Sequence, residues 1–342
     1  MKKYWLPAVA LASGSAFAQS NVVLYGITDV YVGSAQSGLS TTSNGAPSNA
    51  TQSQGVVNSG GFQTSRWGFR GDEDLGGGLK ANFQIETTLL ADVGATQTAG
   101  AFGDRESWVG LSGRFGAFKL GRTYTPQHTF RASLNNTANA PLGTTTDVFK
   151  AVGGDFTNNK SNQLLYVSPN LGGVTGSLSY SLGENKTATT PSYDTVSLYV
   201  RYDQGPLSAG YSFQKEEAAA GDSKYHYWGG AYDFGVARVI GGFQQTKRPA
   251  TTFGTTEERE YTLGVQAPIG ATTVYLGYAS AKGENAAGAT TEKASGFNAL
   301  VLYSLSKRTG VYVAYKKVTE KNGAGTTQGK LETTVVGLRH TF

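Results

Sequence analysis

The sequence predicts an all-β fold, namely a 16-stranded antiparallel β-barrel that spans a membrane. Three observations lead to this fold class. Many segments alternate between apolar and polar residues, the connections are alternately short and long, and the composition is rich in glycine and aromatic residues. The chain of 342 residues contains 47 Gly, 19 Tyr and 16 Phe. These residue types favour strands and tight turns over helices.

The segment 79–90, LKANFQIETTLL, shows the alternation most clearly. Successive side chains of a strand point to opposite faces, so its two faces differ in polarity. One face carries Leu79, Ala81, Phe83, Ile85 and Thr87, and the other carries Lys80, Asn82, Gln84, Glu86 and Thr88. A soluble sandwich would bury the apolar face in a core, whereas a membrane barrel would turn it to lipid and enclose water with the polar face.

The number and length of the strands favour the barrel over the sandwich. Most strands have at least the roughly 9–11 residues that a tilted strand needs to cross a bilayer, whereas sandwich strands average about five or six. Short turns rich in Gly and Asp alternate with long connections rich in Ser, Thr and Asn, as in outer-membrane barrels with long outer loops. The predicted strands are 21–32, 61–71, 79–90, 104–112, 117–124, 162–169, 174–182, 195–203, 207–215, 224–233, 236–247, 259–268, 272–282, 295–305, 310–320 and 329–342.

Aromatic residues indicate which faces meet lipid. Trp67 and Phe69 share a face of the second predicted strand, and Trp108 is placed outward on the fourth, opposite Arg105. Aromatics near many strand ends are typical of the girdles that barrels carry at both membrane interfaces. The last strand ends at Phe342, and we expect it to pair with the first strand so that no edge is left open in lipid.

The N-terminus reads as a secretory signal peptide. It has a basic start, MKK, an apolar run over 4–12 that is too short to span a membrane, and an end with small residues, SGSAFA. We therefore expect cleavage of residues 1–18 and a single barrel domain over 19–342. Removing Lys2 and Lys3 lowers the formal charge from +5 to +3. The remaining bases are spread along strands with acids nearby, so we expect no nucleic-acid partner.

Several segments resemble a known family. The start NVVLYG over 21–26 is similar to the opening of trimeric Gram-negative general porins, nearest the neisserial-type, beta-proteobacterial branch. The longest match, SRWGFRGDEDLGGGLKA over 65–81, resembles the family pattern S-R-x-G-x-(K/R)-G-x-E-D-L-G-G-G-L-K-A. Shorter matches are RESWVGL over 105–111, LGR over 120–122, LYVSPN over 165–170 and GLRHTF over 337–342.

The resemblance implies an assembly, a location and a function. The protein would be a homotrimer in the outer membrane of a Gram-negative bacterium, in contact with membrane lipid and lipopolysaccharide. Its third outer loop would fold into the barrel and narrow a water-filled pore for passive diffusion of small hydrophilic solutes.

Charged residues on the strands are candidates for lining this pore. Arg or Lys facing lipid at mid-membrane costs about 2–4 kcal/mol in a barrel, so charges should face the water inside. On this ground the pore-lining set includes Arg66, Arg70, Lys80, Glu86 and Arg105. By resemblance, Arg66 and Arg105 match the family's constriction arginines and Glu86 a nearby carboxylate. A role for Arg66 and Glu86 as a pair that supports the wall stays open beside this one.

The segment 125–160 is too long for an idle connection and resembles the infolded loop. From it we add Arg131, Asp147, Lys150 and Lys160 to the pore-lining set. The acidic Pro-Glu-Phe segment of many porins is replaced by NNTANAPL over 135–142. With fewer acids opposing the arginines, the constriction should be net positive and the pore should prefer anions. Arg122 shares parity with Phe118 and Leu120, which we place outward, and it is left out of the pore set.

Enzymatic functions find little support in the sequence. His128, His226 and His340 are far apart and lack metal-ligand spacing. No Gly-x-Ser-x-Gly elbow is present, and the glycine clusters lie in hairpin turns rather than before helices. We expect no catalytic residue, cofactor or metal. Besides a diffusion pore, a substrate-specific channel with a saturable site on the third loop and an adhesion or structural barrel stay open, as does a hydrolase built from distant residues.

Overall fold

The computed structural model describes residues 21–36, 38, 53–134, 142–251 and 254–342. The predicted signal peptide, most of the first long loop and residues 135–141 lie outside the described residues. The strands and helices are β1 (Asn21–Gln36), β2 (Gln54–Ser59), β3 (Arg66–Gly76), β4 (Leu79–Leu90), β5 (Ala95–Thr96), β6 (Glu106–Gly113), β7 (Gly116–Tyr124), α1 (Pro126–Ser133), α2 (Thr145–Lys150), β8 (Asn159–Val167), β9 (Val174–Ser181), β10 (Thr195–Gln204), β11 (Leu207–Glu216), β12 (Ser223–Asp233), β13 (Arg238–Lys247), β14 (Glu257–Ile269), β15 (Thr272–Glu284), β16 (Thr290–Ser304), β17 (Thr309–Asn322) and β18 (Thr327–Thr341).

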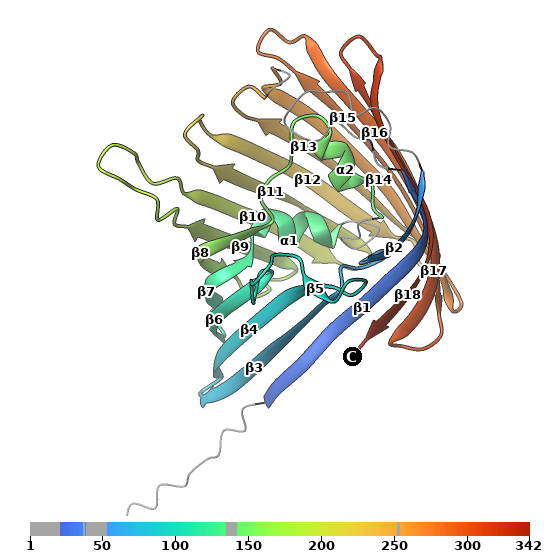
Figure 1. The fold of residues 1–342 in the computed structure, drawn as a ribbon. Helices are drawn as coiled ribbons and strands as arrows, with labels where there is room; N and C mark the ends of the chain where they lie inside the picture. The colour runs from blue at the N-terminus through green and yellow to red at the C-terminus, as the bar shows by residue number, and fades with distance from the viewer. Residues whose placement is uncertain (1–20, 37, 39–52, 135–141, 252–253) are drawn as a thin grey trace, which may run out of the picture.

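The described strands form a closed antiparallel barrel (Figure 1). Each wall strand pairs with the next along the chain, and β1 pairs with β18 from Ile27↔Thr341 to Gln36↔Glu332, which removes both edges of the sheet. The short β5 pairs only with the end of β4, and β2 and β3 are two segments that pair with the same strand, β1. The wall described here thus has 16 strands, which confirms the predicted fold class.

The second wall strand differs from its prediction. The sequence predicts a continuous strand over 61–71, but the strand is interrupted at 60–65, between β2 and β3. Asp29 of β1 holds this interruption and is 0% exposed. Its carboxylate accepts hydrogen bonds from the backbone N–H groups of Gly61, Phe62 and Gln63 at 2.7–3.1 Å and from the Tyr312 hydroxyl at 2.6 Å. A buried carboxylate with four donors is well satisfied, so this segment is fixed against the wall.

Burial alternates along the strands as the sequence pattern predicts. On β16, Glu292, Ala294 and Asn298 are buried, whereas Lys293 and Phe297 between them are exposed. The outward positions around the wall carry large exposed apolar side chains, among them Leu164, Leu178, Val200, Leu263, Leu276, Val313, Val336 and Leu338. A continuous apolar outer face is the surface that a barrel presents to lipid. Among the described helices, neither is long and apolar enough to cross a membrane.

Trp108 lies on the face opposite to the predicted one. In the β4–β6 pair it stands across from Gln84, and the adjacent inner pair is Glu86↔Glu106, whereas Val109 and Leu111 point outward and are exposed. The prediction of an outward Trp108 was wrong because β6 begins at Glu106. Arg105 precedes this strand and does not follow its alternation. The Trp108 ring instead packs under Lys119, whose Nζ lies 4.0 Å from the ring centroid.

The helices of the connection between β7 and β8 pack against the wall strands (Figure 1). Its helix α1 packs on β10–β12, and α2 packs on β15–β17. Phe130 of α1 and Leu134, which caps its C-terminus, pack with Tyr227, and a Cβ at Gly229 would stand 2.5 Å from Leu134. The wall therefore carries a glycine where Leu134 comes closest to it, beside the larger Tyr227. The cluster around α2 also contains small wall residues, with buried Ala279, Ala281 and Ala294 facing Val148, Phe149 and Val152.

Candidate functional site

One carboxylate and two guanidinium groups meet on the inner wall at β3, β4 and β6. Glu86, which is only 6% exposed, lies on the polar face of β4. Its Oε1 is 2.6 Å from Nε of Arg105, and its Oε2 is 3.5 Å from Nε of Arg66. The Tyr25 hydroxyl donates a third contact to Oε2 at 3.0 Å. Because one carboxylate is shared by two arginines, this group carries a net positive charge towards the lumen.

Two rings extend the cationic group onto the infolded loop. Arg105 lies over the ring of Tyr124 at 5.6 Å, and His128 stacks on the same ring at 4.5 Å with an interplanar angle of 16°. Helix α1 begins between them because the Thr125 side chain accepts a hydrogen bond from the N–H of His128 and Pro126 follows it. The cap thus places His128 over Tyr124.

His128 is neutral at physiological pH. Burial of the ring, together with the charge of the nearby Arg131, lowers its pKa from 6.5 to about 4. A neutral imidazole adds no charge to the site at pH 7 but would add one below about pH 4.

An ion pair closes the infolded loop on itself. The guanidinium group of Arg131 on α1 donates to both carboxylate oxygens of Asp155, at 2.9 and 2.5 Å, and one nitrogen also reaches Gln244 of β13 at 3.3 Å. Both side chains are almost fully buried, with 9% and 2% exposed. Burial alone would raise the pKa of Asp155, but the Arg131 charge and hydrogen bonds outweigh it and leave that pKa below its usual value. This bidentate pair joins the two ends of the loop to the wall.

Helix α2 places two opposite charges at the edge of the lumen. Asp147 accepts a hydrogen bond from Nζ of Lys316 on β17 at 2.6 Å, which fixes α2 to the far wall. Lys150, in the last turn, is exposed and has no carboxylate partner within ion-pair distance among the described residues. Its ammonium group is therefore free to meet solutes.

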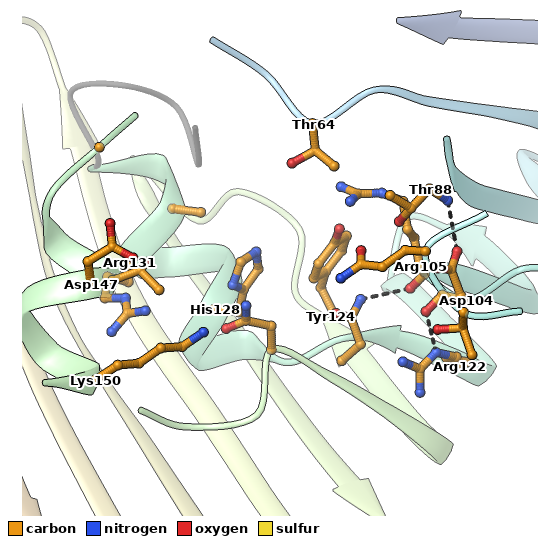
Figure 2. A pocket seen from close by; sticks show the side chains of 17 residues that line it. Thr64, Thr88, Asp104, Arg105, Arg122, Tyr124, His128, Arg131, Asp147 and Lys150 are labelled. Atoms are coloured by element: carbon orange, nitrogen blue, oxygen red, sulfur yellow. Dashed lines mark hydrogen bonds between the residues drawn. The ribbon is translucent and has the colours of Figure 1, made fainter. Parts of the chain in front are cut away.

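These groups line two cavities between the loop and the wall, of about 460 and 400 Å³. Figure 2 shows Asp147 and Lys150 on one side of the larger cavity, Arg105, Asp104 and Arg122 on the other, and His128 and Tyr124 between them. Arg105, Tyr124 and His128 line both cavities. The ionisable residues that line one or both, besides His128 and Tyr124, are Arg66, Glu86, Asp104, Arg105, Glu106, Arg122, Arg131, Asp147 and Lys150.

The structure brings together six of the nine predicted pore-lining residues around these cavities. They are Arg66, Glu86, Arg105, Arg131, Asp147 and Lys150. Arg70, Lys80 and Lys160 line neither cavity. Arg70 lies over the ring of Tyr25 at 5.0 Å, Lys80 pairs with Asp72 at 3.0 Å near a short turn, and Lys160 lies 3.6 Å from Glu216.

Sequence reasoning missed several residues of the site. Arg122 lines the larger cavity, where its Nε donates to the backbone oxygen of Asp104 at 2.7 Å. A register shift after Gly121 in the β7–β8 pair disturbs the simple alternation from which an outward Arg122 was inferred. Tyr124 and His128 could have been predicted to lie close together, since Thr125-Pro126 is typical of a helix start. These two residues lie on either side of that helix cap.

A closed barrel with an apolar outer face, charged inner walls and an inward-folded loop defines an outer-membrane channel. This chain belongs to the Gram-negative porin family, whose model matches residues 6–323. It is 34% identical to outer membrane porin protein 32 of Delftia acidovorans, over 98% of both chains. It is 29% identical to major outer membrane protein P.IB of Neisseria lactamica, over 81% of this chain and 83% of that one.

The solved structures agree with the family match. The anion-selective porin from Comamonas acidovorans superposes with a TM-score of 0.78 at 30% identity, over 95% of this chain and all of that one. The protein is therefore an outer-membrane porin of a Gram-negative bacterium, and it forms a water-filled pore for passive diffusion of small hydrophilic solutes.

Proposed function

We propose that this porin passes small anions in preference to cations and that Arg66, Arg105 and Lys150 set this preference at the constriction. The two cavities are lined by five cations, Arg66, Arg105, Arg122, Arg131 and Lys150, and by four carboxylates, Glu86, Asp104, Glu106 and Asp147. The excess is one positive charge, so a modest preference is expected rather than exclusion of cations.

The exposure of these groups supports the same sign. The side chains of Arg66 and Arg105 are 25% and 17% exposed, whereas that of Glu86 between them is 7% exposed. Lys150 is exposed, while Asp147 is engaged by Lys316. At the Glu86 group a solute in the lumen therefore meets the arginines before the carboxylate, whereas Asp147 is 29% exposed but paired with Lys316. Fixed charge in a narrow passage raises the local concentration of counter-ions. The anion selectivity named for the porin from Comamonas acidovorans agrees with this proposal.

We also propose roles for the rest of the predicted set and for the assembly. Arg131 and Asp147 would hold the loop, whereas Arg70, Lys80 and Lys160 would line wider parts of the lumen. The working unit would be a homotrimer in contact with lipid and lipopolysaccharide, formed after removal of residues 1–18 and without catalytic activity. N-terminal sequencing of the purified protein tests the cleavage, and its mass in detergent tests the trimer.

The selectivity is tested by reversal potentials in a salt gradient across a planar bilayer of neutral lipid. The wild-type channel should give a potential of the sign for anion preference. Arg66→Ala and Arg105→Ala should each move it towards cations. Arg70→Ala is the matched control, because it removes the same charge from the same wall outside both cavities. Cation preference in the wild type, or an equal shift for Arg70→Ala, would overturn the proposal.

A further inference from the structure

Two rows of basic side chains lie on the outer face of the barrel, at the ends of the strands that carry the long loops. In the first row, Lys215 stands directly opposite Lys224, and Lys224 directly opposite Lys247. The second row runs across β14–β17 and lies one residue pair further from the loops than the first. Its opposed residues are Arg259, Lys282, Lys293 and Lys321, one on each strand. We call these seven residues the outer basic belt.

The alternation of burial places the belt outside. Tyr225, Thr246, Glu258 and Glu292, each adjacent in sequence to a belt residue, are buried on the inner side. Lys224, Lys247, Arg259, Lys293 and Lys321 are exposed, and Lys215 and Lys282 are 29% and 44% exposed.

The protein itself neutralises the belt only in part, because three of its seven cations form ion pairs and Glu257 stands opposite Lys247. Lys215 forms ion pairs with Glu217 and Asp222. Arg259 forms ion pairs with Glu257 and Glu284, and Lys282 forms one with Glu284. Within the described part of the chain, Lys224, Lys247, Lys293 and Lys321 form no ion pair. Like charges directly opposite each other on neighbouring strands destabilise a sheet. Two consecutive rows of them indicate that a negatively charged layer outside the protein balances their charge.

The height of the belt identifies that layer. An aromatic girdle lies towards the membrane from it, in which Tyr211, Trp228, Phe243 and Tyr261 contact one another in series across β11–β14. Lys224, Lys247 and Arg259 stand two to four residues beyond these rings on their own strands, which is about 7–14 Å along a strand. Aromatic girdles mark the membrane interface, so the belt lies at the level of the headgroups on the side of the long loops, which is the outer leaflet.

The belt covers only part of the circumference. The first row continues on β10, β9 and β8 as Val196, Tyr180 and Leu164, and all three positions are apolar or aromatic. A general need for solubility near the loops would place lysines on all strands. The two rows of opposed cations are instead confined to β11–β17, and β18 adds one exposed cation near the same level, Lys330.

We infer that the outer basic belt is a binding site for the phosphate groups of outer-leaflet lipopolysaccharide. The row of lysines across neighbouring strands, about 5 Å apart, can meet several phosphate oxygens of one headgroup while its acyl chains lie on the apolar wall below. This site is separate from the pore, so the inference does not depend on the direction of ion selectivity.

Native mass spectrometry of the detergent-purified protein, titrated with lipid A that carries two phosphates, tests the site. Lys224→Gln/Lys247→Gln and Lys282→Gln/Lys293→Gln/Lys321→Gln should bind about fivefold more weakly for each lysine removed. Arg114→Gln/Lys307→Gln/Arg308→Gln is the control, because it removes three exposed cations from the short turns at the other end and should bind as the wild type does. Unchanged conductance in neutral lipid shows that each variant is folded.

Two further arms identify the ligand. Lipid A without phosphates should bind as weakly to the wild type as lipid A with two phosphates binds to the belt variants. Inorganic phosphate at the same molar concentration should not displace the bound lipid, because it lacks the chains that hold it at the wall. Equal binding of the phosphate-free lipid, or an equal loss in the short-turn control, would overturn the inference.

Discussion

The cations inside the barrel and those outside it are arranged in opposite ways. Inside, Arg66 and Arg105 share the carboxylate of Glu86, and Arg131 is matched by Asp155. Outside, Lys224 faces lysines on both neighbouring strands, and no ion pair is formed by it among the described residues. Arg66, Arg105 and Arg131 are therefore held in place by carboxylates of the protein, whereas Lys224 lies between two like charges.

The difference follows from what each group meets. A pore must attract solutes without retaining them, so its charges are fixed in position and largely compensated. A surface in permanent contact with an anionic leaflet gains from uncompensated charge, because the partner is always present.

The largest effect should come from the pair that closes the loop. Arg131→Met leaves the carboxylate of Asp155 buried and unpaired, which costs about 3–5 kcal/mol. Because the pair joins the loop to the wall rather than one wall strand to another, the loss should appear as local opening of the loop. Hydrogen exchange of the amides in α1 and α2 should become faster, and single-channel current should become noisier.

The double variant Arg131→Met/Asp155→Asn is the control for this prediction. It removes the uncompensated charge together with the pair, so protection of α1 and α2 should return in part. If Arg131→Met leaves exchange in both helices unchanged, Arg131 does not hold the loop.

The next effect concerns the shared carboxylate. Glu86→Gln removes a charge-assisted contact of Arg105 and should destabilise the site by about 1.5–3 kcal/mol. It also leaves Arg66 and Arg105 uncompensated, so the reversal potential should move further towards anion preference. Asp72→Asn removes an equal charge near a short turn, where its partner Lys80 is half exposed, and should change the potential much less. A shift towards cations in Glu86→Gln would contradict the assignment.

The barrel could be predicted from the sequence because its physical cause is local. The alternation of apolar and polar residues with a period of two, together with the lengths of turns and loops, determines where the strands lie. Strand β4 begins and ends where this alternation predicts. The interruption at 60–65 could not be seen, because it depends on Asp29 and Tyr312, which are far away along the chain. Trp108 was assigned to the wrong face because the alternation was counted from Arg105, which lies before the strand begins.

Part of the site could also be predicted from the sequence, because it depends on local patterns. Arg66, Glu86 and Arg105 follow from the polarity of two strand faces and from the resemblance. The ion pair of Arg131 with Asp155 could not be predicted, because the two residues are 24 positions apart and only the fold of the loop brings them together. Arg131 was accordingly predicted to face the pore, and the structure gives it a buried partner as well.

A smaller effect is expected from relieving the repulsion outside. Lys224→Glu places a carboxylate opposite both Lys215 and Lys247, and each cross-strand pair of opposite charges is worth about 0.2–1 kcal/mol. In neutral detergent without lipopolysaccharide, thermal unfolding should therefore occur at a slightly higher temperature than in the wild type. Lys307→Glu changes the same charge in a short turn and should have no such effect. A less stable Lys224→Glu protein in that detergent would show that the belt is not strained.

The smallest effect should come from His128. Its pKa in the folded protein is about 4, below the ordinary 6.5, so the ring stays neutral from pH 8 down to about pH 5. Over that range His128→Asn should match the wild type in reversal potential. Below about pH 4 the wild type alone should gain a positive charge at the constriction and become more anion-preferring than the variant.

The low pKa of His128 also makes folding stability depend on pH. Because the folded state binds the proton of His128 less readily than the unfolded state does, its contribution to stability falls as the pH drops from about 6.5 towards 4. His128→Asn should remove this part of the pH dependence, while the carboxylates titrate equally in both proteins. A difference in reversal potential between the two proteins at pH 7 would mean that His128 is charged there, and the Arg105–Tyr124–His128 stack would then contribute to selectivity through two cations rather than one.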